Sequence, residues 1–113
     1  MHFIFDLDHT AIDSTHRAIT RPDGSLDLAA WRRNNTKANI MADTLLPLAK
    51  EWQRLAKKNV TIVICTARVM GEHDYEFLRR HGLRWDACLS RLEGDRSPDA
   101  ELKERMLRKY AQA

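Results

Sequence analysis

The sequence has few of the features that mark disulfide-rich, low-complexity or membrane proteins. Its 113 residues include two cysteines, three prolines and four glycines, too few for a disulfide framework or a low-complexity chain. No apolar run approaches the ~20 residues that a membrane span needs, and the N-terminal HFIF stretch lacks the features of a secretory signal. Cys65 and Cys88 both lie in apolar stretches, which favours free thiols that pack as small apolar groups. These absences predict a cytoplasmic protein that does not contact a membrane.

The composition is that of one globular domain. Apolar residues make up 43% of the chain and charged residues 31%. A chain of 113 residues is long enough for one hydrophobic core but not for two. The formal net charge is +3, a mild basic excess that is compatible with a polyanionic partner but does not require one.

Apolar runs and helical periodicity alternate along the chain. The runs predict strands, and VTIVIC has no polar alternation, as is typical of a parallel strand buried on both faces. Helices are predicted where apolar residues recur every three or four positions. The expected strands are 2–5, 60–65 and 86–89, and the expected helices are 47–59, 72–81 and 98–110. Strands that alternate with helices indicate an α/β domain in three layers with a short parallel sheet.

The segment 11–43 does not fit this alternation. It is polar, it is interrupted by RPDG, and it shows helical character only around 26–34. Because it is too long for a plain connector, we interpret it as a flap or lid over a site. The expected organisation is one domain, 1–113, with this segment as an insertion.

Polar side chains follow each predicted strand. Ligands of parallel α/β sheets bind outside the carboxyl ends of the strands, so residues that follow different strands are expected to meet at one edge. Three separate segments thus bring carboxylates, a hydroxyl and cations together. The residues concerned are Asp6 and Asp8 after the first strand, Thr66 and Arg68 after the second, and Lys103 after the third.

At these positions the sequence resembles a known family. DLDHT, TAR and GDRSPDAELKE are similar to the first three motifs of the haloacid dehalogenase (HAD) superfamily phosphatases, and most nearly to the phosphatase domain of bacteriophage polynucleotide kinase. The third motif matches at Gly94, Asp95, Asp99, Lys103 and Glu104. The resemblance implies a Rossmann-like HAD fold and a magnesium-dependent phosphomonoesterase that acts on nucleic-acid 3′-phosphate ends or on nucleotides.

The resemblance also implies roles for single residues. Asp6 would attack phosphorus and become an aspartyl-phosphate, and Asp8 would protonate the leaving oxygen and then activate water. Both would hold Mg²⁺, which would offset their mutual repulsion. Thr66 would hydrogen-bond a phosphoryl oxygen, and Lys103 would hold the transferring group beside the nucleophile.

Four further residues are expected to bind substrate. Arg68 would be a second phosphate clamp or a contact to a nucleic-acid backbone, and Arg96 would add to the grip on a polyanion. Thr10 closes the first motif. His9 stands where the family usually has glycine, and its side chain either touches substrate or is only tolerated there.

The family's fourth motif, an acidic pair after one more strand, does not appear before the sequence ends at KYAQA, so the expected fold is truncated after the helix with the third motif. Three explanations stay open for the metal site. Water or another acid such as Asp13 completes it, a companion chain supplies the strand, or the protein has lost catalysis and binds a phosphorylated ligand or a partner protein.

The substrate and the oligomeric state are two further expectations. A small-molecule phosphatase is an alternative to an enzyme that acts on nucleic-acid ends. The first strand would also keep an unpaired edge, and an exposed apolar edge favours pairing with another chain. We therefore expect a homo-oligomer with 2–5 or 102–110 in its interface.

Overall fold

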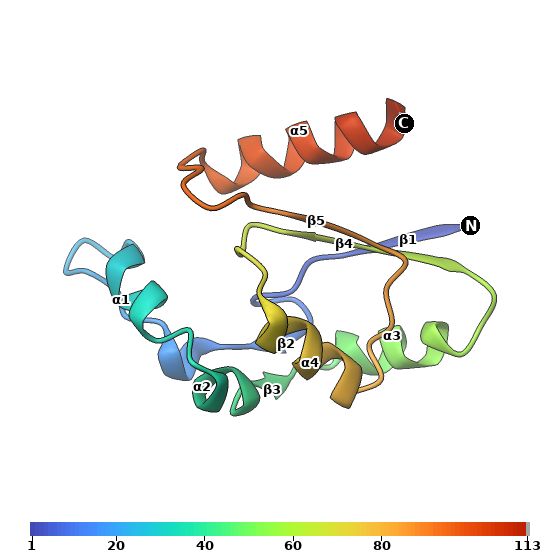
Figure 1. The fold of residues 1–113 in the computed structure, drawn as a ribbon, viewed down its shortest axis with the longest axis horizontal. Helices are drawn as coiled ribbons and strands as arrows, with labels where there is room; N and C mark the ends of the chain where they lie inside the picture. The colour runs from blue at the N-terminus through green and yellow to red at the C-terminus, as the bar shows by residue number, and fades with distance from the viewer. Residues whose placement is uncertain (113) are drawn as a thin grey trace.

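A computed structural model describes residues 1–112, and a three-stranded parallel sheet lies at its centre (Figure 1). The strands are β1 (His2–Phe5), β4 (Thr61–Thr66) and β5 (Ala87–Ser90), in the order β1-β4-β5. The register pairs Phe5 with Ile64 and Thr66 with Ser90. All three predicted strands are confirmed, two of them displaced by a single residue, and their carboxyl ends lie at one edge of the sheet.

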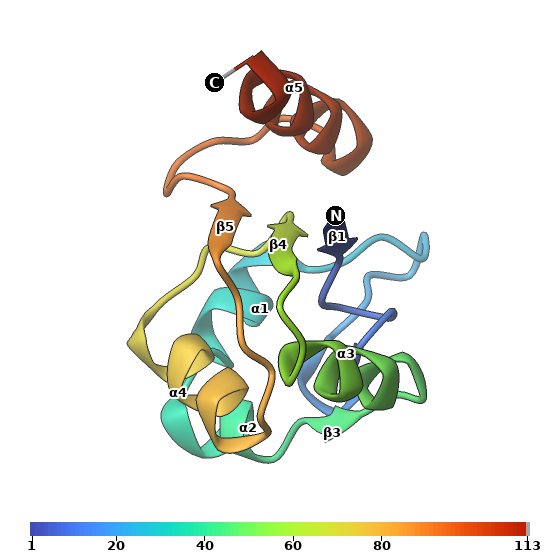
Figure 2. The ribbon, with the colours of Figure 1, turned by 90° about the vertical axis from the view of Figure 1, so that its right-hand side faces the viewer.

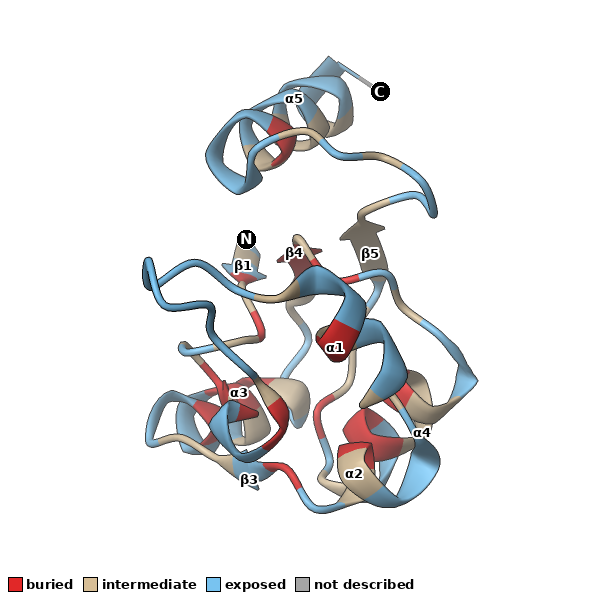
Figure 3. Cartoon of the chain, turned by 90° about the vertical axis from the view of Figure 1, so that its left-hand side faces the viewer, coloured by how far each residue is buried: buried red, intermediate tan, exposed pale blue. Residues whose placement is uncertain are grey.

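Helices cover both faces of this sheet. The helix α5 (Asp99–Gln112) lies on one face, and α3 (Leu48–Ala56) and α4 (Glu72–Arg80) lie on the other (Figure 2). Buried residues gather in β4, α3 and α4, whereas α5 is mostly exposed (Figure 3). The predicted α/β architecture with a short parallel sheet is therefore confirmed. Within residues 1–112 no helix is long and apolar enough to cross a bilayer.

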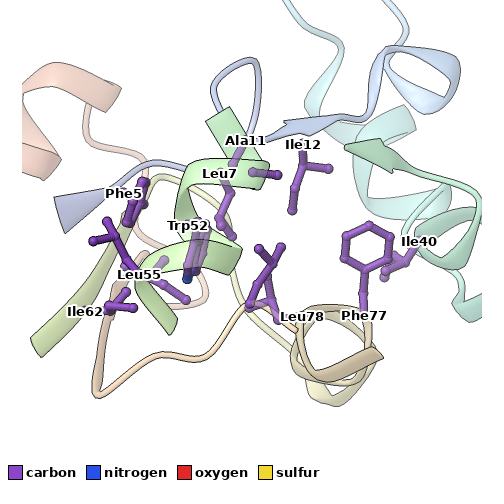
Figure 4. Close-up of a cluster of buried hydrophobic side chains, with 13 residues drawn as sticks. Phe5, Leu7, Ala11, Ile12, Ile40, Trp52, Leu55, Ile62, Phe77 and Leu78 are labelled. Atoms are coloured by element: carbon purple, nitrogen blue, oxygen red, sulfur yellow. The ribbon is translucent and has the colours of Figure 1, made fainter. Parts of the chain in front are cut away.

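The core fills the space between the sheet and α3 and α4 (Figure 4). Trp52 is fully buried, its ring stacks on Phe5 at 4.8 Å, and its indole N–H donates to the carbonyl of Arg84 at 2.8 Å. Cys65 and Cys88 are free thiols, as predicted. The stacking of Phe5 on Trp52 adds about 0.5–1.5 kcal/mol to the free energy gained by burying the two rings.

The segment 11–43 is built into this core. It contains β2 (Ile12–Asp13), η1 (Thr15–Arg17), α1 (Leu28–Arg33) and α2 (Lys37–Met41), and β2 pairs antiparallel with β3 (Thr44–Leu45). The helix predicted around 26–34 is confirmed as α1. Ile12 and Ile40 belong to the main apolar cluster, so the segment is anchored at both of its ends. Its role as a lid stays a prediction.

The strand β1 is an outer strand of the sheet, and one of its two sides is not paired with another strand in the part of the chain that the structure describes. It pairs with β4, and no other strand among residues 1–112 pairs with it. The side chain of Ile4 is an exposed apolar group on this strand, at 51% exposure. Unpaired strand edges of this kind can pair with another chain.

We expect this edge to mediate self-association, as the sequence predicted. Light scattering at micromolar concentration should give a mass above the 13.1 kDa of one chain. Ile4→Lys places a charge on the edge and should shift the mass toward 13.1 kDa. A wild-type protein that scatters as a single chain would contradict this expectation.

Candidate active site

Asp6 is the first residue after β1, and its carboxylate is held from two sides. One oxygen accepts the backbone N–H of Leu7 at 2.8 Å. The other lies 2.7 Å from Nζ of Lys103, which comes from the first turns of α5. The two side chains keep 32% and 29% of their surface exposed. The topology thus brings together two predicted site residues that are far apart in the sequence, at a place that solvent reaches.

The loop after Asp6 turns sharply around one carbonyl. The oxygen of Leu7 accepts the N–H groups of Thr10, Ala11 and Ile12 at 2.9–3.2 Å. His9 has a φ of 64° in this turn, a left-handed conformation in which glycine is favoured. The side chain of His9 is exposed, and histidine is one of the residues that adopt this conformation more often than most. Substrate contacts by His9 and Thr10 stay predictions.

Asp8 is bound by Arg68 through two hydrogen bonds. Nε and Nη2 of the guanidinium lie 3.1 and 2.5 Å from the two carboxylate oxygens, and the hydroxyl of Ser14 donates to Asp8 at 2.6 Å. The third guanidinium nitrogen donates to Asp74 at 2.7 Å. The Arg68 side chain is only 2% exposed. The arginine expected to clamp phosphate is therefore occupied by the protein's own carboxylates in this arrangement.

This pairing changes the acidity of both groups. Burial alone raises the pKa of Asp8, but the hydrogen bonds and charge of Arg68, with the bond from Ser14, outweigh it and lower the pKa below its ordinary value of 3.8. Burial alone lowers the pKa of Arg68, but Asp8 and Asp74 outweigh it and raise the pKa. Asp8 is a carboxylate at neutral pH in this arrangement.

The lowered pKa of Asp8 predicts how stability depends on pH. A carboxyl with a lower pKa in the folded than in the unfolded state stabilises the fold at pH values above its ordinary pKa, and that stabilisation is lost as the pH falls through the folded value. The gap in unfolding free energy between the wild type and Asp8→Asn should be constant above about pH 5 and shrink below the ordinary pKa of 3.8. Urea unfolding of both proteins across this range measures it, and a gap that does not change with pH would contradict the pairing.

A second buried ion pair lies next to the first. Arg17 donates to both oxygens of Asp43, at 2.9 and 3.0 Å, and neither side chain is more than 1% exposed. Nε2 of His16 lies 2.7 Å from the same carboxylate. The ring of Trp31 lies 4.3 Å from the guanidinium of Arg17 and 6.0 Å from that of Arg68. The pair joins the two ends of segment 11–43, and Asp43 also lies 3.8 Å from Nη2 of Arg68, which links the segment to the arginine that holds Asp8.

The other predicted site residues lie in different surroundings. Thr66 is fully buried, and its hydroxyl accepts the backbone N–H of Arg68 at 3.0 Å. Arg96 is exposed, and within residues 1–112 no hydrogen bond joins it to Asp6, Asp8 or Lys103. The carboxylate of Asp13 accepts two hydrogen bonds from Thr15. Contacts of Thr66 and Arg96 with substrate stay predictions.

The two aspartates of the third motif support the connection between β5 and α5. Asp95 accepts the backbone N–H and the hydroxyl of Ser97 and pairs with Arg105 at 2.8 Å. Asp99 accepts a hydrogen bond from Arg91 at 2.8 Å. In the arrangement described, both carboxylates bind groups of this connection.

The side chains of two arginines bind backbone carbonyls. Arg84 donates to the carbonyls of Ala56, Lys58 and Val60 at the amino end of β4. Arg91 donates to the carbonyls of Ala67, Asp95 and Ser97, which lie in two loops at the carboxyl end of the sheet. The position of Arg91 two residues after a predicted strand is the signal that could have indicated its role, because the carboxyl end of the sheet was already expected to hold the site.

The fold and the site define a small α/β protein with a carboxylate–lysine pair and a buried arginine–aspartate cluster at one edge of a parallel sheet. The family model described as bacteriophage T5 5′-deoxynucleotidase matches residues 1–106. The chain belongs to this family. The 5′-deoxynucleotidase of Escherichia phage T5 is 44% identical over 85 residues, which are 72% of this chain and 35% of that protein. The chain thus spans about a third of the length of this relative. No solved structure matches the chain.

These findings correct the resemblance drawn from the short motifs. The chain belongs to the phage T5 5′-deoxynucleotidase family and not, as the motifs suggested, among HAD phosphatases that resemble polynucleotide kinase. A few residues at fixed spacing in three segments are weaker evidence than a match along 1–106. The expectation of a fourth motif, and of a fold truncated before it, came from the same resemblance. The architecture that holds is the coarser one, an α/β protein with a short parallel sheet.

Proposed function

We propose that this protein removes the 5′-phosphate of deoxynucleotides at a site built around Asp6. Support comes from the family, in which the relative from phage T5 is named a 5′-deoxynucleotidase. The observation that carries the proposal is the position of Asp6, a part-exposed carboxylate at the carboxyl end of β1 with Nζ of Lys103 at 2.7 Å. Ligands bind at this edge in parallel α/β sheets, and a lysine there attracts a phosphate dianion.

The proposed reaction uses Asp6 as the nucleophile. One of its oxygens forms a bond to phosphorus while the bond from phosphorus to the 5′-oxygen breaks, and the electron pair leaves on that oxygen, which takes up a proton. Water then gives up a proton and attacks the phosphorus, and the bond from phosphorus to the Asp6 oxygen breaks, which releases inorganic phosphate and restores the Asp6 carboxylate. Lys103 orients the carboxylate and neutralises charge on the transferring group.

Asp8 is the proposed acid and base of this reaction, because it lies two residues from Asp6 in the same turn. Its hydrogen bonds to Arg68 and Ser14 fix the orientation of its carboxylate. Proton donation to the leaving oxygen requires Asp8 first to take up a proton, which weakens its contact with the guanidinium of Arg68. General acid–base assistance of this kind contributes about 10²–10⁴-fold to a rate.

The same two carboxylates are the proposed ligands of a magnesium ion. Mg²⁺ prefers oxygen ligands and commonly binds through one or two carboxylates while it keeps several waters. Asp6 and Asp8 keep 32% and 23% of their side-chain surface exposed, so water reaches both. No group of three or more candidate ligands occurs within residues 1–112, so the proposed holder is this pair of carboxylates with waters in the other positions. The ion would supply positive charge beside the transferring phosphate.

A mononucleotide is a better proposed substrate than a nucleic-acid 3′ end. The expectation of a 3′-phosphate came from the resemblance to polynucleotide kinase, which the family match replaces. Arg96, the exposed arginine expected to grip a polyanion, forms no ion pair with Asp6 or Asp8 within residues 1–112. One phosphate needs only a local cation, and Lys103 supplies it.

A substrate panel tests the proposal. Phosphate release should be fastest from deoxynucleoside 5′-monophosphates and much slower from the 3′-monophosphates, a 3′-phosphorylated oligonucleotide and an aryl phosphate. EDTA should abolish the release, and added Mg²⁺ should restore it. Equal rates on the aryl phosphate would favour a small-molecule phosphatase. Binding of nucleotide without any release would favour a binding module and would overturn the proposal.

A further inference from the structure

The helix α5 carries Lys103 but is weakly anchored to the rest of the protein. Of its residues only Leu102 is buried, and Figure 3 shows the remainder of the helix as exposed or intermediate. In Figure 2 the helix lies alone on its face of the sheet. Burial of one leucine contributes about 1.5–3 kcal/mol, which is little for a helix that has to place an ammonium group against Asp6. Something else has to fix the start of α5.

Arg91 supplies a second attachment at that point. Its side chain is 14% exposed. Nε donates to the carbonyl of Ala67 at 2.8 Å, and Nη1 donates to the carbonyls of Asp95 and Ser97 at 2.8 and 2.9 Å. Nη2 donates to the carboxylate of Asp99 at 2.8 Å. One rigid planar group thus joins the loop after β4 to the loop that leads into α5.

The partners of Arg91 connect it to both halves of the site. Ala67 lies between Thr66 and Arg68, in the loop whose arginine holds Asp8. Asp99 is the first residue of α5, and Lys103 follows it by one helical turn. Because a helix is stiff over one turn, a shift at its first residue moves the lysine by a similar amount.

We propose that Arg91 is a positioning residue that sets Nζ of Lys103 against Asp6 by clamping the start of α5 to the loop after β4. This inference rests on the proposed reaction at Asp6. A lysine in place of Arg91 keeps the charge but cannot reproduce the forked set of donors. Displacement of a reacting or charge-stabilising group by about 1 Å costs on the order of 10²-fold in rate.

The structure contains a matched control at the opposite end of the sheet. Arg84 donates to three backbone carbonyls and pairs with Asp86 at 2.7 Å, so it is a clamp of the same kind far from Asp6. We expect Arg91→Lys to lower kcat on a deoxynucleoside 5′-monophosphate by about 10²-fold with a change in KM below about threefold. Arg84→Lys should lower stability by a similar amount and leave kcat unchanged. Equal effects of the two variants on kcat would overturn the proposal.

A double-mutant cycle tests whether Arg91 acts through Lys103. In a Lys103→Met background, Arg91→Lys should cause no further loss of kcat, because the group that it positions is already absent. Additive losses would overturn the proposal. If Arg91→Lys does not fold, Asp99→Ala removes one bond of the clamp at an exposed carboxylate, and it should lower kcat by about 3–10-fold in the wild-type background only.

A measurement without substrate separates this inference from the proposed function. The ammonium resonance of Lys103, assigned by NMR through its loss in Lys103→Met, should be preserved in Arg84→Lys and shifted or broadened in Arg91→Lys. An unchanged resonance in Arg91→Lys overturns the positioning role. If the two variants show this NMR pattern but the wild-type protein releases no phosphate, the proposed reaction is overturned and the positioning role of Arg91 is kept.

Discussion

Asp6→Asn should reduce phosphate release from a deoxynucleoside 5′-monophosphate by at least about 10³-fold, because the amide can neither attack phosphorus nor attract a cation. The fold should survive this change. The Asp6 side chain is a third exposed, and the side-chain oxygen of asparagine still accepts the N–H of Leu7. Steady-state release of phosphate measures the activity, and thermal unfolding followed by circular dichroism checks the fold.

Glu93→Gln is the matched control for this prediction. Glu93 is an exposed carboxylate in the loop after β5, and the substitution makes the same acid-to-amide change near the same edge of the sheet. Its turnover should equal that of the wild type. Near wild-type turnover of Asp6→Asn would show that Asp6 is not the nucleophile.

Asp43→Ala should lower the free energy of unfolding by about 3–5 kcal/mol, the cost of leaving a buried charge without its partner. The guanidinium of Arg17 is 1% exposed, and both of its bonds to Asp43 would be lost. His16 would lose its partner on the same carboxylate. Urea unfolding at pH 7 measures the loss, which is a large fraction of the stability of a small domain.

Glu51→Ala provides the comparison for Asp43→Ala. Glu51 pairs with Arg54 on α3, where both side chains are about half exposed, and such pairs contribute about 0–1 kcal/mol. If Asp43→Ala destabilises the protein no more than Glu51→Ala does, the buried cluster does not hold segment 11–43 in place.

The sequence was sufficient to predict the sheet and the principal pair of the site. Unbroken apolar runs such as that of β4 form strands buried on both faces, and the rule that parallel strands present their carboxyl ends at one edge placed Asp6 near Lys103. The same rule brought Asp8 and Arg68 together. The contacts within both pairs follow from the order of strands and helices, which the apolar pattern of the sequence indicates well.

The partners of these residues could not be read from the sequence. Asp43 and Arg17 meet only because segment 11–43 folds back on itself, and no periodic pattern marks such a contact. Arg68 was expected to face a phosphate, yet in this arrangement it binds Asp8 and Asp74. Residue type indicates that an arginine binds an anion, but only the packing decides which anion it meets.

The family assignment drawn from the motifs was wrong for a different reason. The motifs around Asp6, Thr66 and Lys103 contain few residues, so they are compatible with more than one family of phosphate-handling proteins. The match along 1–106 uses the whole chain and favours the phage T5 5′-deoxynucleotidase family. This changes the expected position of the phosphate on the substrate from 3′ to 5′. The proposed chemistry at Asp6 now rests on the position of that carboxylate beside Lys103 at the carboxyl end of β1.

Trapping the phosphorylated protein tests the central claim most directly. The protein is mixed with a deoxynucleoside monophosphate that carries a radioactive 5′-phosphate and is quenched in acid within the first turnover. The account predicts label on the peptide that contains Asp6, removable by hydroxylamine, and no label in Asp6→Asn. Release of labelled phosphate with no labelled protein at any time, or label on a different peptide, would contradict it.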